Sequence, residues 1–182
     1  MNAIFKVGTT RLDGERIILR KFIESDLDEF YAYASVDGVG QPAGWWPHQN
    51  IEESKMILYM FIRDDKTFAI INKETGKLMG SVGIELLNDK DLIASPKLGR
   101  ELGYVLGKDY WNKGYMTEVV KLVTNYCFKT LHFDFLCIGC FVSNAKSQNV
   151  ALKCGYKLYS KTIFKTHYNT FEDNENFILY NE

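Results

Sequence analysis

The sequence has little net charge and no long apolar run, and these two absences exclude two large classes of protein. Its 182 residues carry a formal net charge of −1, so there is no excess of basic side chains with which to bind a nucleic-acid backbone. No apolar run approaches the ~20 residues that a transmembrane helix needs, and the first residues lack the apolar segment of a signal peptide. We therefore expect a cytoplasmic protein that has neither nucleic acid nor a membrane as a partner.

Metal and redox sites have little support as well. The three histidines are far apart in the chain and show no ligand spacing. Of the four cysteines, Cys137 and Cys140 form a C-x-x-C pattern, but they lie in an apolar segment (135–142) that is typical of a buried strand. Residues three apart on a strand point to opposite faces. We expect core thiols in a reducing compartment, and no bound metal.

Nucleotide-binding motifs are also absent. The chain contains neither the G-x-G-x-x-G pattern of dinucleotide-binding turns nor the G-x-x-x-x-G-K-[ST] pattern of phosphate-hydrolysing proteins. A nucleotide-dependent switch is therefore a poor interpretation of this sequence.

What is present is the composition and element order of a globular α/β protein. Apolar residues make up 46% of the chain and charged residues 25%, which is ordinary for a soluble domain. The length suits one domain over residues 1–182, with a core of about 10–180. Periodicity and turn signals predict strands at 16–22, 67–72, 78–87, 100–106, 135–142, 156–164 and 176–180, helices from an N-cap at Ser25 and at 50–63, 115–129 and 144–154, and a loop at 88–99. This order indicates an α/β fold around one mixed sheet.

The segment from Glu101 to Glu118 combines a strand, a turn that contains glycine and the start of a helix. Gly114 lies in the turn, where the lack of a side chain lets the backbone approach a bound group closely. The following helix directs its free N–H groups and the positive end of its dipole to the same place. The arrangement predicts a phosphate site, with the Glu101 carboxylate just upstream as a candidate base.

Three local patterns resemble the GCN5-related N-acetyltransferase (GNAT) superfamily, over about residues 10–180. Residues 11–22 (Arg-Leu-Asp-Gly-Glu-Arg-Ile-Ile-Leu-Arg-Lys-Phe) resemble the first strand of its RimJ/RimL-like branch, which acetylates ribosomal-protein N-termini. Glu101-Leu-Gly-Tyr104 with Trp111-Asn-Lys-Gly-Tyr-Met-Thr-Glu118 resembles that branch's acetyl-CoA motif, and Asn144-Ala-Lys-Ser147 with Lys153-Cys-Gly-Tyr156 resembles its last helix. The resemblance implies the GNAT fold: a mixed, mostly antiparallel sheet of six to seven strands, flanked by about four helices.

The resemblance also implies acetyl-CoA as co-substrate, without a metal. The strand end would pair with the pantetheine arm, and the turn would offer N–H groups to the pyrophosphate. Met116 departs from the family pattern, which usually has glycine or alanine there. On the last helix an asparagine contacts the cofactor arm and a serine lies near it, with helix capping as the alternative role of both. The implied cofactor-binding residues are Val105, Leu106, Asn112, Lys113, Gly114, Tyr115, Met116, Thr117, Asn144 and Ser147.

An acetyltransferase needs a group that accepts a proton, because free amines are mostly protonated near neutral pH. Glu101 is the catalytic candidate, since apolar neighbours on its strand would raise the pKa of its carboxyl. An ion pair with Arg100 or a surface position is the alternative, and Glu85 is the reserve candidate base. Many relatives carry a tyrosine or serine as general acid on the last helix, but the aligned residue here is Ala151. Another group or water must then protonate the leaving thiolate.

The loop between the first two helices is rich in glycine and proline, and in GNAT proteins this loop borders the acceptor. We expect Trp45, Trp46 and His48 of the loop, with Tyr31 on the preceding helix, to bind the acceptor; a lid on the core or a homodimer contact is the alternative. The favoured acceptor is the N-terminal α-amine of a protein or peptide. The alternatives are a small amine (amino sugar, polyamine or antibiotic) and a non-catalytic acyl-CoA-binding module.

Overall fold

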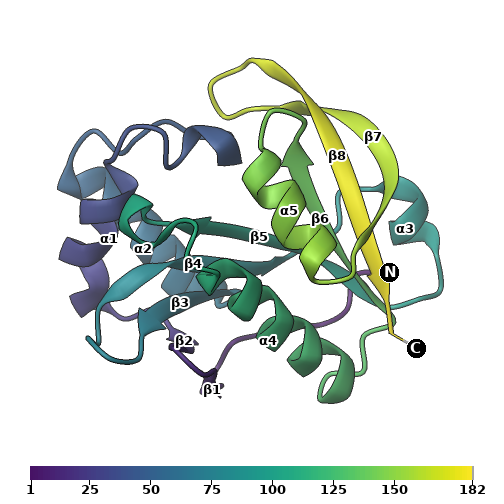
Figure 1. Ribbon diagram of the computed structural model, residues 1–182, viewed down its shortest axis with the longest axis horizontal. Helices are drawn as coiled ribbons and strands as arrows, with labels where there is room; N and C mark the ends of the chain where they lie inside the picture. Colours follow the sequence, from purple (N-terminus) through teal and green to yellow (C-terminus); the bar gives the residue numbers. More distant parts are fainter. Residues whose placement is uncertain (182) are drawn as a thin grey trace.

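The computed structural model describes residues 1–181, which form an eight-stranded sheet with helices on both faces (Figure 1). The strand order is β1-β2-β3-β4-β5-β6-β8-β7, and every neighbouring pair is antiparallel except β5 and β6. The strands are β1 (Leu12–Asp13), β2 (Ile17–Lys21), β3 (Thr67–Asn72), β4 (Leu78–Glu85), β5 (Gly99–Leu106), β6 (Phe135–Phe141), β7 (Lys157–Lys165) and β8 (Phe171–Tyr180). The helices are α1 (Leu27–Ala34), α2 (Ile51–Asp64), α3 (Lys90–Ala94), α4 (Tyr115–Lys129) and α5 (Ala145–Lys153), with 3-10 turns η1 (Glu24–Asp26), η2 (Gln41–Ala43) and η3 (Lys108–Tyr110). None of these helices is long and apolar enough to cross a membrane.

The predicted α/β fold with a mixed, mostly antiparallel sheet is confirmed, but several details were wrong. Residues 1–181 contain eight strands where six to seven were predicted, because β1 is two residues long and shows no alternation. The predicted loop 88–99 contains a fifth α-helix, α3, whose N-cap Asp89 accepts hydrogen bonds from the N–H groups of Asp91 and Leu92. Helix α1 begins at Leu27 and not just after Ser25, because the 3-10 turn η1 precedes it.

Alternation along the strands divides the core between the two faces of the sheet. Phe68 of β3 packs in one cluster with Val119 of α4, whereas its neighbour Ala69 packs in another with Leu58 of α2. The two cysteines of the C-x-x-C pattern also fall in different clusters, and both are buried and free. The prediction of core thiols on opposite faces of β6 is therefore confirmed.

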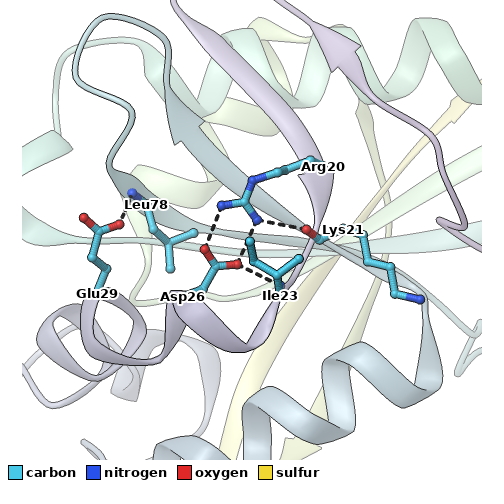
Figure 2. Close-up of polar contacts among 6 residues, drawn as sticks. All are labelled: Arg20, Lys21, Ile23, Asp26, Glu29 and Leu78. Carbon is cyan, nitrogen blue, oxygen red and sulfur yellow. Dashed lines mark hydrogen bonds and ion pairs between the residues drawn. The ribbon is translucent and has the colours of Figure 1, made fainter.

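An ion pair between the partly exposed Arg20 and the buried Asp26 fixes α1 against the sheet (Figure 2). The guanidinium of Arg20 on β2 donates two hydrogen bonds to the Asp26 carboxylate, at 2.8 and 2.7 Å. Asp26 is 4% exposed and also accepts the N–H of Ile23 at 2.9 Å. On α1, Glu29 accepts the N–H of Leu78, the first residue of β4, at 2.7 Å. Because bidentate pairs are geometrically specific, these contacts set the position of α1 on β2 and β4.

Strands β5 and β6 pair over three residues and then diverge. The paired residues are Gly99–Glu101 with Phe135–Cys137, but β5 continues to Leu106 and β6 to Phe141. On its other edge, β5 stays paired with β4 as far as Leu106. Residues 102–106 therefore present, toward β6, a backbone edge that no strand within residues 1–181 pairs with.

Candidate active site

The divergence of β5 and β6 opens a cavity of about 1100 Å³. Its walls include residues 102–106 of β5, residues 139–141 of β6 and the first turns of α4 and α5. The η2 segment and the β7–β8 hairpin form the remaining side; in Figure 1 the connection between β7 and β8 approaches the η2 segment, and the His167 N–H donates to the Gly44 carbonyl at 2.9 Å. All the predicted cofactor-binding residues except Lys113 line this cavity, and so does Glu101.

The turn before α4 has a backbone suited to an anion. Gly114 is the N-cap of α4 and has φ of 79°, a left-handed conformation that residues with a side chain rarely adopt. Because glycine has no side chain to cap the helix, the N–H groups of the first turn can serve a bound phosphate. The Nζ of Lys113 instead donates to the carbonyl of Asp109 at 2.7 Å.

Arg16, just before β2, stabilises this turn through hydrogen bonds, and the sequence analysis did not identify it. Its Nη1 donates to the Lys113 carbonyl and its Nε to the Glu118 carboxylate, each at 2.9 Å. The guanidinium lies 4.5 Å from the centre of the Tyr115 ring. A Cβ atom at position 114 would lie 3.5 Å from Arg16 Nη2. The Arg16 guanidinium thus lies beside the candidate phosphate site. The sequence did not indicate this role, because a single arginine at the start of a strand belongs to no recognisable pattern.

Hydroxyl and amide groups lie along the middle of the cavity. Asn144 caps α5 by accepting the Ser147 N–H at 3.1 Å, and its Nδ2 donates to the Pro42 carbonyl at 3.3 Å. The Ser147 hydroxyl lies 2.8 Å from the hydroxyl of Tyr104 on β5, and both residues line the cavity. Ala151 belongs to the core cluster and is completely buried. The position at which relatives carry a general acid therefore faces the core in this chain.

Glu101 lies at the end of the cavity that borders β4 and β6. In the register of β4 and β5 it stands opposite Glu85, which also lines the cavity. Burial and then the charge of Glu85 raise the pKa of Glu101 from an ordinary 4.5 to about 7; Asp89 adds to this, and a hydrogen bond from the backbone of Asn88 opposes it. A carboxyl with this pKa is partly ionised near neutral pH and can accept a proton there.

No cation compensates Glu101 within residues 1–181. Lys66 pairs with Glu85. Arg100, the alternative partner considered from the sequence, donates to the Ala3 carbonyl at 2.6 Å, as expected for neighbours on a strand whose side chains point to opposite faces. No ion pair in the described chain includes Glu101.

The four residues expected to bind the acceptor do not line the cavity. Trp45 packs against the core cluster of α1 and α2, and the buried His48 lies against its ring, with 5.2 Å between the ring centres. Trp46 is 57% exposed and stacks on Tyr168 of the β7–β8 connection at 4.6 Å, while Tyr31 is half-buried on α1. The loop reaches the cavity wall through its η2 segment instead.

An open strand edge beside a helix N-terminus, with a carboxyl of raised pKa in the same cavity, is the arrangement expected of a CoA-dependent acyltransferase. The sequence model described as an acetyltransferase (GNAT) domain matches residues 16–157. The chain therefore belongs to the GNAT family of acetyltransferases, and the predicted family and enzyme class are confirmed.

Named relatives and solved structures agree with this family assignment. The chain is 26% identical over 151 residues to the uncharacterized N-acetyltransferase YoaA of Bacillus subtilis (strain 168), covering 80% of this chain and 82% of YoaA. A GNAT-family acetyltransferase from Bacillus anthracis superposes with a TM-score of 0.83 at 20% identity, covering 94% of this chain and 99% of the other. Ribosomal-protein-S5-alanine acetyltransferase from Vibrio fischeri superposes with a TM-score of 0.74 at 19% identity, covering 95% and 97%. At these identities the two structures establish a shared fold alone.

Proposed function

We propose that this enzyme transfers the acetyl group of acetyl-CoA to the N-terminal α-amine of a protein or peptide. The observation that carries the transfer is Glu101, a carboxyl with a pKa of about 7 in a cavity that ends at a helix N-terminus. The Vibrio fischeri protein, which shares the fold and is named for a ribosomal-protein alanine, supports a peptide acceptor. A small amine is the second candidate, because the chamber beside Glu101 is only about 70 Å³, with room for roughly five water-sized groups.

Acetyl-CoA would lie along the cavity. The N–H groups of residues 112–117 would bind the pyrophosphate, and the open edge of β5 at residues 105–106 would pair with the amides of the pantetheine arm. Asn144 and Ser147 would contact the same arm from α5. When bound, the thioester supplies an activated acetyl carbonyl and a thiolate leaving group.

The reaction then requires two proton transfers, one from the amine and one to the thiolate. Glu101 accepts a proton from the attacking amine, directly or through water. The amine nitrogen bonds to the acetyl carbon, the carbon–sulfur bond breaks, and the thiolate takes up a proton, so the products are an amide and CoA. The Ser147 and Tyr104 hydroxyls lie on the cavity wall as a proton source, with water as the alternative, whereas Ala151 offers none.

An acceptor screen tests this function. Thiol release from acetyl-CoA should be seen with peptides that have free Ser or Ala N-termini, and not with the same peptides blocked by N-acetylation. Gly114→Val is the control enzyme: a branched side chain at a φ of 79° should distort the turn and abolish CoA binding in calorimetry. Turnover with amino sugars, polyamines or antibiotics alone would reassign the acceptor. Cofactor binding without turnover on any amine would support the non-catalytic module.

A further inference from the structure

Two asparagines on β8 lie on the same face of the sheet as Glu101, and the chemistry above gives them no role. Asn176 lies opposite Gly139 in the register of β6 and β8, and Asn174 lies two residues further along. Both share the face of the sheet that carries Glu101, because Glu101 pairs with Cys137, two residues before Gly139. Asn174 is 6% exposed and lines the chamber together with Glu101.

A chain of hydrogen bonds fixes the orientation of Asn174. Asn176 donates from Nδ2 to the hydroxyls of Ser160 and Thr162 on β7, at 3.1 and 3.0 Å. Its Oδ1 accepts a hydrogen bond from Nδ2 of Asn174 at 2.8 Å. The Oδ1 of Asn174 remains as an acceptor, and no hydrogen bond within residues 1–181 reaches it. It is not among the enclosed side-chain atoms that lack a partner, and Asn174 lines the chamber, so this oxygen is open to a donor from a substrate.

Gly139 keeps open the space between this pair and Glu101. A Cβ atom at position 139 would lie 3.1 Å from Oε1 of Glu101, 3.3 Å from Nδ2 of Asn174 and 3.3 Å from Oδ1 of Asn176. Three polar side chains therefore surround one spot, and any residue larger than glycine would occupy it. Glycine therefore leaves the space between the Glu101 carboxylate and the Asn174 amide open to a substrate.

We propose that Asn174, held by Asn176, positions the acceptor amine; this inference rests on the proposed acetyl transfer. A neutral primary amine has two N–H groups and one lone pair. Oδ1 of Asn174 accepts one N–H, Glu101 accepts the other and takes that proton, and the lone pair forms the bond to the acetyl carbon. The acceptor class is a primary amine, because a secondary amine has a single N–H and leaves one of the two groups without a partner.

Steady-state kinetics of Asn174→Ala test this role with the amine found in the screen. The kcat/KM for the amine should fall roughly 10- to 100-fold, as expected for the loss of one hydrogen bond in a buried site. The KM for acetyl-CoA and the slow thiol release without amine should stay within about twofold of the parent, since neither depends on an oriented amine.

Three further variants separate positioning from a structural role. Asn174→Asp keeps an acceptor oxygen but adds a negative charge near Glu101, in addition to the charges of Glu85 and Asp89. This charge should raise the pKa of Glu101, so the rise of kcat/KM on the acid side should move up by about one pH unit. Asn176→Leu frees Asn174 to rotate and should give an intermediate loss. Glu175→Gln is the matched control: it lies between the two asparagines, points to the opposite face and pairs with Lys161 at 2.9 Å, and it should leave the kinetics unchanged.

Two results would overturn the positioning role. One is kcat/KM for Asn174→Ala within twofold of the parent; the other is an equal loss in thiol release without amine, which would make the pair structural. Melting temperatures identify a variant that does not fold. If Asn174→Ala does not fold, the pH profile of Asn174→Asp, which keeps the side chain's size, tests the positioning role instead. A parent enzyme inactive on every amine overturns the proposed function as well, whereas an active parent with unaffected variants overturns only the role of Asn174.

Discussion

Two carboxylates inside this protein have opposite surroundings. Asp26 is 4% exposed and receives two hydrogen bonds from the Arg20 guanidinium and one from the N–H of Ile23. Glu101 has no cation beside it within the described chain, and Glu85 stands opposite it in the sheet. The compensated charge holds α1 on the sheet, while the uncompensated carboxyl gains the proton affinity of a base near neutral pH. The groups that surround each carboxylate thus favour a structural role for Asp26 and make Glu101 the candidate base.

The largest expected effect is on turnover at Glu101. Glu101→Gln keeps the side chain's size but cannot accept a proton, so kcat should fall by roughly 10²–10⁴-fold with acetyl-CoA affinity nearly unchanged. In the parent, kcat/KM should rise with pH through about 7, the pKa of Glu101, and again at about pH 8 as the acceptor α-amine loses its proton; the variant should lose the first rise and keep the second. Thiol release measured from about pH 5.5 to 9 checks both expectations. Near-parental turnover at neutral pH would assign the proton-accepting role to Glu85 or to water.

A smaller effect, on stability rather than turnover, is expected at Asp26. Asp26→Asn leaves the Arg20 guanidinium without its charged partner, so the free energy of unfolding should fall by about 2–3 kcal/mol. Urea denaturation measures this change, and turnover per folded molecule should be retained. Asp13→Asn is the control, because its pair with Arg11 lies at the surface and should matter little. A loss of turnover in folded Asp26→Asn would show that α1 controls the site and would break the comparison.

The smallest expected effect is a gain of stability in Glu101→Gln at high pH. The native parent binds a proton at Glu101 more tightly than the unfolded chain, since the pKa is about 7 in the fold and ordinarily 4.5. The parent therefore loses stability as pH rises through this window, by up to roughly 3 kcal/mol, whereas glutamine does not titrate. The variant should be more stable than the parent by about 1–2 kcal/mol at pH 8 and show no gain below pH 4.5. If the urea midpoints of the parent and the variant depend on pH in the same way, Glu101 behaves as a hydrated surface carboxylate.

Periodic segments could be predicted from the sequence, whereas irregular ones could not. Helix α4 has its predicted bounds, Tyr115–Lys129, because the apolar spacing and the glycine before it are local signals. Strand β8 was predicted from residue 176 but begins at Phe171. Its first residues are mostly polar and show no alternation, and their place is set by pairing with β7.

The same distinction applies to the candidate site. Glu101 and Gly114 belong to one continuous segment, so the sequence alone could indicate both. Arg16 and Asn174 could not be found in this way, because each lies far along the chain from this segment and gains its partners only in the folded protein. The surroundings of Trp46 could not be predicted either, because its partner Tyr168 lies far along the chain, on the β7–β8 connection.

The divergence of β5 from β6 has a thermal consequence. The sheet consists of two halves, β1 to β5 and β6 to β8, whose paired seam is three residues long. Across the cavity, the halves are also joined by the hydrogen bonds from Asn144 to the Pro42 carbonyl and from the His167 N–H to the Gly44 carbonyl. A ligand that lies along the open edge crosslinks the halves, and at one hundred times its Kd it adds about 2.7 kcal/mol to the folded state. The resistance of this enzyme to heat is thereby coupled to the supply of its own co-substrate.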